Sequence, residues 1–325
     1  MPAENITLSL LSIISLVSFF VVFLVSKFSN KIGNGILLDQ DFNKPQAFHK
    51  DSVSRSGGLA GTISLSIFFI LYYFLFEKIL IDYIALSLSM FLIGFLEDIK
   101  FKINPNYRLL LMIIFLSFFI IFFSIRVGSV DLNFLNLWIK NDIFSILFIL
   151  LCFLFIINGA NLIDGFNGLL TIHILIINSI LLFLNLEYNQ DHLSLTITAQ
   201  IVILLSFLLF NFPKAQIFLG DSGSYLFGAL VAYNIIETNN LNPQISSFFF
   251  CILLFYLFFE VFFSFFRKIY LKKSPLKPDR FHLHMLSYLY LEKSKKFQDC
   301  NYLNSLVINI FYLSLILPAI FFHDN

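Results

Sequence analysis

The chain carries little charge for its length. Of its 325 residues, 13% are charged, whereas 58% are hydrophobic and the mean hydropathy is +0.86. Charge this sparse cannot solvate the surface of a protein of this size, so a soluble globular fold is excluded. The net charge of +1 identifies no partner by itself, and no nucleic-acid binding is expected.

Cysteine is also scarce. Cys152 and Cys251 lie in apolar runs, and Cys300 lies in a polar segment. An odd, scattered set of this kind forms neither a disulfide framework nor a metal site.

Long apolar runs are abundant. A membrane helix needs roughly 20 apolar residues, and windows of about 19 residues give ten candidate spans. They start near Ile6, Gly57, Ile79, Arg108, Asp142, Gly168, Leu193, Ser222, Ile245 and Tyr302. The sequence therefore predicts an all-α, polytopic integral membrane protein of about ten transmembrane helices, which forms one domain over residues 1–325.

Lys and Arg are distributed unequally between the two sets of loops. One set holds 18 of the 21, and positive residues concentrate in cytoplasmic loops. The predicted cytoplasmic loops are about 29–56, 98–107, 159–167, 212–221 and 267–301. Both termini then lie on the outer side, and the first span, followed at once by Lys27 and Lys31, is predicted to be an uncleaved anchor.

The first of these loops is basic. His49, Lys50 and Arg55 precede Gly57-Gly58, and a Gly pair that opens a helix suits a phosphate, because free backbone N–H groups and the helix dipole favour an anion. Taken alone, the loop is interpreted as an ordinary positive cytoplasmic loop, with a phosphate site as the alternative.

Glu97 and Asp98 form a pair of carboxylates at the inner end of the third span. The dipole of their own helix disfavours anions there. A metal ion, a basic neighbour or proton transfer would account for them, and a solvated helix end is the alternative.

Two further segments are rich in Gly and Asn. Asp164 lies in a loop without Lys or Arg, which indicates either a wrap around a polar ligand or a tight turn. Asp221 lies between glycines just before an apolar helix, where Mg²⁺ could take this carboxylate together with phosphate oxygens. Capping of that helix by Ser222 or Ser224 is the alternative.

The last large loop contains Arg280-Phe-His282-Leu-His284. Two histidines suggest Zn²⁺, but no Cys or third His accompanies them, and contacts to an anion fit better; a plain solvated loop is the other interpretation. Glu260 is a carboxylate within an apolar run and therefore a candidate site residue. His173, alone in a span, is interpreted as a packing histidine.

Taken together, these segments resemble the polyprenyl-phosphate N-acetylhexosamine-1-phosphate transferases, which include phospho-N-acetylmuramoyl-pentapeptide transferase and the enzymes that initiate O-antigen synthesis. Asn161-Leu-Ile-Asp164-Gly-Phe-Asn167-Gly resembles the family's Asn-Leu-x-Asp-Gly-x-Asp-Gly block, and Asn211-x-x-Pro followed by Phe218-Leu-Gly-Asp221 resembles a second block. His282-x-His284 resembles its cytoplasmic histidine motif. The resemblance runs from about residue 38 to 284 and is closer to the O-antigen-initiating branch.

The resemblance implies transfer of a sugar-1-phosphate from a UDP-N-acetylhexosamine to undecaprenyl phosphate, a membrane lipid, with release of UMP. The expected place is the cytoplasmic face of the bacterial inner membrane, and the expected cofactor is Mg²⁺, or alternatively Mn²⁺, with Asp221 as the metal ligand. The implied catalytic residues are Glu97, Asp98, Asp164, Asp221, His282 and His284. The implied substrate contacts are His49, Lys50, Arg55, Asn161, Asn167, Asn211, Phe218 (stacked on uracil) and Arg280.

The sequence departs from the family pattern at three positions. Glu97 stands where the family usually has Asp, Asn167 replaces a second Asp, and Met285 replaces a frequent third His. The sugar, the general base and the oligomeric state stay open, a homodimer included. A pentapeptide transferase is the enzymatic alternative, and a transporter or flippase is the non-enzymatic one, although a transporter would carry polar groups to the membrane midplane.

Overall fold

Helices form nearly all of the regular structure of the protein. The computed structural model describes residues 3–29, 31, 35–40, 52–101, 103–274, 279–297 and 299–323. Within them the helices are α1 (Ala3–Phe28), α2 (Gly57–Phe76), α3 (Ile81–Asp98), α4 (Pro105–Phe122), α5 (Asn133–Ile139), α6 (Asp142–Ile163), α7 (Leu169–Glu187), α8 (Asp191–Asn211), α9 (Gly220–Leu241), α10 (Ser247–Leu253), α11 (Phe255–Tyr270), α12 (Leu283–Ser294) and α13 (Cys300–Ile320).

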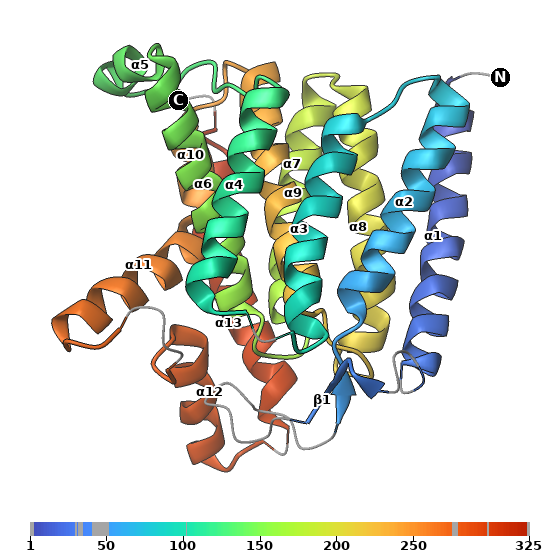
Figure 1. The fold of residues 1–325 in the computed structure, drawn as a ribbon, viewed down its shortest axis with the longest axis vertical. Coiled ribbons are helices and arrows are strands. Elements are labelled where there is room, and N and C mark those ends of the chain that lie inside the picture. Colours follow the sequence, from blue (N-terminus) through green and yellow to red (C-terminus); the bar gives the residue numbers. More distant parts are fainter. Residues whose placement is uncertain are drawn as a thin grey trace.

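The long helices stand side by side as a bundle (Figure 1). Seven of them are long and apolar enough to cross a membrane: α1, α2, α4, α6, α7, α8 and α13. The pair α10 and α11, bent by 66° at a short break, gives an eighth candidate span. The expectation of an all-α, multi-pass membrane protein is therefore confirmed.

The remaining two predicted spans coincide with α3 and α9, which are more polar. The ends of α3 carry Asp82, Glu97 and Asp98, and α9 carries Asp221 and Glu237. Both helices run through the bundle among the apolar ones (Figure 1), and α9 is buried along most of its length. Burial against protein explains why α9 needs no continuous apolar surface. The count of ten spans stays a prediction for these two helices.

Packing of α3 against α9 depends on one glycine. A Cβ atom placed on Gly94 would lie 2.4 Å from the carbonyl oxygen of Asp221. Only glycine permits this approach, so the inner end of α3 comes to lie directly beside the first turn of α9.

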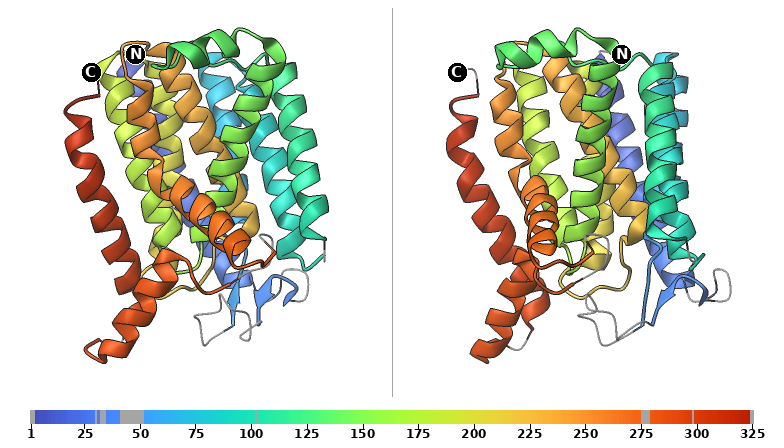
Figure 2. Two further views of the ribbon diagram at one scale, coloured as in Figure 1. Left: turned by 90° about the vertical axis from the view of Figure 1, so that its left-hand side faces the viewer. Right: turned by 60° about the vertical axis from the view of Figure 1, so that its left-hand side comes forward.

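The two ends of the bundle differ. The strands β1 (Leu38–Asp39) and β2 (Val53–Ser54) and the helix α12 lie at one end, hereafter the site end, whereas α1 begins and α13 ends at the other (Figures 1 and 2). The strands pair antiparallel, and Ser54 also forms a parallel bridge with Ile217. The hairpin is thus fastened to the segment that leads into α9.

Candidate active site

Asp98 binds the N-terminus of a different helix. Its carboxylate accepts hydrogen bonds from the backbone N–H groups of Asp221 and Ser222, both at 2.9 Å, and from the Ser222 hydroxyl. The N-terminal end of a helix stabilises an anion, whereas the C-terminal end of Asp98's own helix does not. This contact accounts for a carboxylate that the sequence left unexplained, and it shows that Asp98, rather than Ser222 or Ser224, caps α9.

Gly220 allows Asp98 to reach the first turn of α9. Its φ angle is +77°, and a Cβ atom placed there would lie 2.7 Å from an oxygen of the Asp98 carboxylate. A side chain at this position would be strained by the backbone conformation and would collide with Asp98. The glycine before Asp221 is therefore required by this junction.

Asp221 is a partly exposed carboxylate of this cluster. Its side chain is 22% exposed. One oxygen accepts a hydrogen bond from Asn161 Nδ2 at 3.0 Å, and the other lies 3.7 Å from Arg108 Nη1. Asn161 also donates to Ser224 Oγ at 3.1 Å. Asp221 is thus oriented by its neighbours but keeps an open side.

Glu97 lies next to Asp221 through a shared arginine. Its Oε1 is 3.6 Å from Arg108 Nη1, the same nitrogen that faces Asp221. In the sequence Arg108 marks only the start of an apolar run, and nothing in its local sequence distinguishes it as a site residue. The basic neighbour proposed for the Glu97–Asp98 pair is therefore present, and it is Arg108.

Asp164 terminates α6 at the same end of the bundle. Burial, followed by the negative charge of Asp221, raises the pKa of Asp164 from its ordinary value to about 7. The next residue, Gly165, faces His284: a Cβ atom placed there would lie 3.8 Å from His284 Nε2. The loop after α6 thus lies between the carboxylates and the histidines.

Replacing Asp164 with Asn should make thermal stability less dependent on pH. A carboxyl group whose pKa is raised by folding favours the folded state at low pH and loses that contribution as pH rises through its folded pKa, here about 7. Between pH 6 and 8 the loss is about 1.4 kcal/mol. Melting temperatures of wild type and Asp164→Asn in detergent should therefore diverge across this range, and parallel curves would contradict the assignment.

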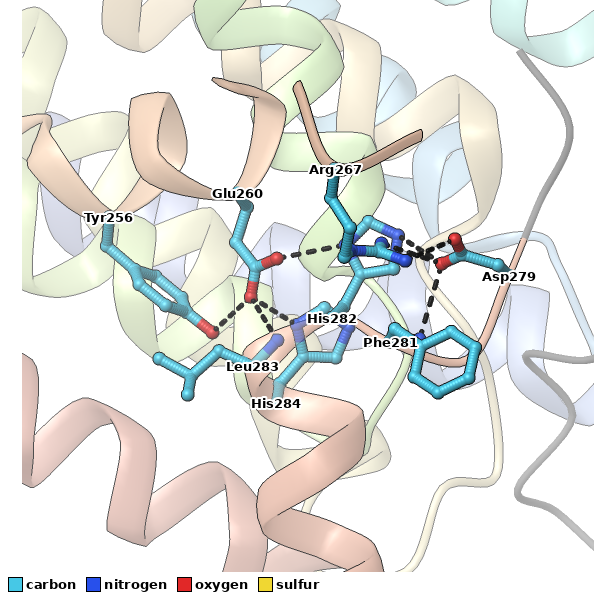
Figure 3. Close-up of polar contacts among 8 residues, drawn as sticks. All are labelled: Tyr256, Glu260, Arg267, Asp279, Phe281, His282, Leu283 and His284. Atoms are coloured by element: carbon cyan, nitrogen blue, oxygen red, sulfur yellow. Dashed lines mark hydrogen bonds and ion pairs between the residues drawn. The ribbon is translucent and has the colours of Figure 1, made fainter. Parts of the chain in front are cut away.

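His282 and His284 are held by Glu260 (Figure 3). The ring nitrogens His282 Nδ1 and His284 Nδ1 lie 2.9 and 3.0 Å from the two carboxylate oxygens of Glu260. All three side chains are buried. Burial lowers the pKa of His284, and the charge of Glu260 opposes this effect. The carboxylate singled out within an apolar run of the sequence is therefore the partner of both histidines.

Asn211 and Asn167 join loops to one another. Asn211 Oδ1 accepts a hydrogen bond from Gly168 N at 2.6 Å, and its Nδ2 donates to Ile217 O at 2.8 Å. Asn167 Nδ2 donates to Pro213 O at 2.9 Å. Their contacts with substrate stay predictions, and the amide of Asn211 has a structural role as well.

The Gly57-Gly58 pair does not present a free phosphate cradle. Gly57 N donates to Phe218 O at 2.9 Å and Gly58 N donates to Leu219 O at 2.8 Å. These bonds attach the start of α2 to the segment before α9, and Phe218, half-buried, is held there through its backbone. The phosphate interpretation of this glycine pair therefore loses the N–H groups on which it depended.

Of the basic residues predicted to contact substrate, the structure describes Arg55 and Arg280. The Arg55 guanidinium donates to Asp39 Oδ2 through Nε at 2.9 Å and Nη2 at 2.6 Å. Arg280 lies exposed in the segment before α12. His49 and Lys50 lie outside the described residues, so their predicted role is neither supported nor opposed.

A metal ion would find one main protein ligand here. Among the residues that the structure describes, no group of three or more His, Cys, Asp or Glu side chains has the arrangement of a metal site. Asp221, partly exposed and oriented by Asn161, fits the pattern of Mg²⁺ sites in which one or two carboxylates act together with substrate phosphates. The residues present therefore suit a metal that arrives with a phosphate ligand, and they do not form a cage.

Comparison with known proteins identifies the class. Residues 80–239 match the family described as glycosyl transferase family 4. An undecaprenyl-phosphate alpha-N-acetylglucosaminyl 1-phosphate transferase of Thermotoga maritima is 28% identical over 272 residues, which cover 83% of this chain and 78% of that protein. A phospho-N-acetylmuramoyl-pentapeptide-transferase of Dictyoglomus turgidum is 33% identical over 233 residues, covering 67% of this chain and 71% of that protein.

The chain belongs to glycosyl transferase family 4. The resemblance inferred from the motifs is thereby confirmed, and the protein is a membrane-embedded transferase of this family. The matched segment contains Glu97, Asp98, Asp164 and Asp221.

Proposed function

We propose that the protein transfers N-acetylhexosamine-1-phosphate from a UDP-N-acetyl sugar to undecaprenyl phosphate and releases UMP. The observation that carries this proposal is the position of Asp221: a partly exposed carboxylate at the start of α9, held between Asn161 and Arg108 at one end of a membrane bundle. The two relatives reported above carry the names of an N-acetylglucosaminyl 1-phosphate transferase and of a phospho-N-acetylmuramoyl-pentapeptide-transferase.

The location suits two anionic substrates. The phosphate of a polyprenyl lipid lies at the headgroup level of the membrane, and a nucleotide sugar arrives from water. Arg108 provides positive charge beside Asp221 and Glu97, and the histidine pair lies across the Asp164 loop. Phosphoryl transfer depends mainly on positioning and on stabilisation of charge, which such an arrangement supplies.

The proposed step exchanges one phosphorus–oxygen bond for another. An oxygen of the lipid phosphate bonds to the phosphorus that carries the sugar, and the bond from that phosphorus to the oxygen of UMP breaks. Asp221 would hold Mg²⁺, which when bound neutralises the diphosphate. Arg108 offsets negative charge beside it, and Asn161 keeps the carboxylate of Asp221 in one orientation.

A pentapeptide transferase is the second candidate, because the relative from Dictyoglomus turgidum carries that name. Both candidates use a lipid phosphate acceptor and release UMP, but they differ in the sugar nucleotide. Purified protein should release UMP from a UDP-N-acetyl sugar only when polyprenyl phosphate is added. A panel of UDP-N-acetylhexosamines beside UDP-N-acetylmuramoyl-pentapeptide decides between the two, and UMP release that ignores the lipid would refute both.

We further infer that the site end faces the cytoplasm of a bacterium, since the loops with 18 of the 21 Lys and Arg residues include those at this end. Alkaline phosphatase fused to the C-terminus should then be active, because α13 ends on the opposite side. An inactive phosphatase together with an active cytoplasmic reporter at the same position would reverse the orientation.

A further inference from the structure

Glu260 is a buried carboxylate on α11, the helix that diverges from the bundle (Figure 1). Large apolar side chains of α11, among them Phe259, Phe262 and Phe266, are exposed. Glu260 lies on the opposite, protected side of the helix, where an ionised carboxylate is costly unless donors surround it. An ionised carboxylate at this position therefore needs hydrogen-bond donors around it.

Four donors converge on Glu260 (Figure 3). Oε1 accepts from Tyr256 OH at 3.2 Å, from Leu283 N at 3.1 Å and from His284 Nδ1 at 3.0 Å, while Oε2 accepts from His282 Nδ1 at 2.9 Å. An ionised carboxylate only accepts hydrogen bonds. Both imidazoles must therefore carry their proton on Nδ1.

The other ring nitrogens face away from Glu260. His282 Nε2 and His284 Nε2 are buried and form no hydrogen bond with any described residue; Asp279 Oδ1 lies 3.7 Å from His282 Nε2, too far for one. His284 Nε2 is directed toward Gly165, beside Asp164. The two rings lie nearly parallel, with centroids 5.5 Å apart. Within the part of the chain that the structure describes, both Nε2 atoms are thus left without a hydrogen bond.

We propose that Glu260 is a positioning residue that fixes both histidines as Nδ1–H tautomers and so leaves both Nε2 lone pairs as acceptors for the P–OH group of a substrate phosphate. Which substrate group they meet rests on the proposed function, whereas the fixing of the tautomers does not. A neutral imidazole without such a partner exchanges between its two tautomers. When one ring nitrogen donates its proton to a fixed acceptor, the other ring nitrogen stays unprotonated.

Glu260→Gln tests the proposal with nearly unchanged volume. The amide has one accepting oxygen, and its NH₂ group can only donate, so it cannot accept from both Nδ1 atoms. In side-chain NMR spectra of ¹⁵N-histidine-labelled protein without substrate, wild type should show His282 and His284 as Nδ1–H tautomers, and the variant should show one of them as Nε2–H. The signals are assigned by single histidine substitutions.

Turnover supplies the second measurement. Glu260→Gln should lose at least about tenfold in kcat, the lower end of the loss seen when the partner that orients a metal-ligating histidine is removed, with a melting temperature close to that of wild type. Tyr256→Phe is the matched control, since it removes a hydrogen bond to the same carboxylate but leaves both histidines held; its histidine spectrum should match wild type and its turnover should stay within about threefold.

Each outcome decides the proposal. Unchanged histidine tautomers in Glu260→Gln overturn it, as does a tautomer switch with normal kcat. If this variant does not fold, Glu260→Asp keeps a carboxylate and should retain both Nδ1–H forms; loss of either form overturns the proposal. If the proposed transfer is absent from wild type while the tautomers switch as described, the proposed function fails and the role of Glu260 in fixing the histidines stands.

Discussion

Asp221→Asn is expected to reduce transfer by about 100-fold or more without unfolding the protein. Removal of one group that stabilises charge in a transition state typically costs this much. An amide is a poorer ligand than a carboxylate for a hard cation, and its neutral charge no longer balances Arg108, whose Nη1 lies 3.7 Å away. Turnover measured at limiting and saturating Mg²⁺ should show the largest loss at limiting metal.

The fold should survive this change because Asp221 does not support the core. Its side chain is partly exposed, and Asn retains the oxygen that accepts from Asn161. Asp142→Asn is the matched control: Asp142 is an exposed acid at the start of α6, 3.2 Å from Arg126, at the opposite end of the bundle. It should keep normal turnover. Near-normal transfer by Asp221→Asn at limiting Mg²⁺ would show that Asp221 is not the metal ligand.

The fold could be predicted largely from apolar runs, because each membrane helix must provide its own length of apolar residues. This argument is weakest for helices shielded from lipid by protein. α9 is buried on most sides and carries Asp221 and Glu237, and although the sequence predicts a span there, α9 is not among the helices that are long and apolar enough to cross a membrane. The bend between α10 and α11 was not predicted either, because no Pro or Gly marks it.

The residues of the candidate site can be named one by one from the sequence, but the contacts between them cannot. Asp98 was recognised as an unexplained anion at its own helix end, yet its partner is the backbone of Asp221 and Ser222, more than 120 positions further along the chain. Glu260 was recognised as a costly carboxylate, and His282 as a site residue, without any local signal that they touch. Such pairings depend on helix packing, which a single sequence does not encode locally.

The same limit applies to Arg108. One Arg at the start of an apolar helix is ordinary for a positive loop, and only the crossing of α3, α4 and α9 brings it to both Glu97 and Asp221. Gly57-Gly58 shows the opposite error: the pattern suited a phosphate, but tertiary hydrogen bonds already occupy the N–H groups. Motif chemistry gives candidates, and the backbone's own hydrogen bonds decide which remain available.

Variants of Glu97 and Asp98 should differ in how their transfer rates depend on pH. Glu97→Gln is expected to be most defective at low pH and to recover at alkaline pH if Glu97 takes a proton from the lipid phosphate as it attacks. A phosphate monoester has its second pKa at about 6, so above this pH the nucleophile is already ionised and needs no base. Below it, the variant should lose about tenfold in rate for each pH unit, whereas wild type should decline less.

Asp98→Asn should behave differently because Asp98 holds α9. Its two oxygens accept three hydrogen bonds from Asp221 and Ser222, and an amide can replace only one of those oxygens as an acceptor. The cost of unmet donors is about 1–3 kcal/mol, so the melting temperature should fall, and the turnover should fall without the recovery at alkaline pH that is expected of Glu97→Gln. The pH–rate profiles of the two variants, measured with the same lipid acceptor, therefore distinguish a proton acceptor from a group that positions Asp221. If Glu97→Gln keeps the wild-type profile and changes only the dependence on Mg²⁺, Glu97 acts through charge on Arg108 and the metal, and it is not the base.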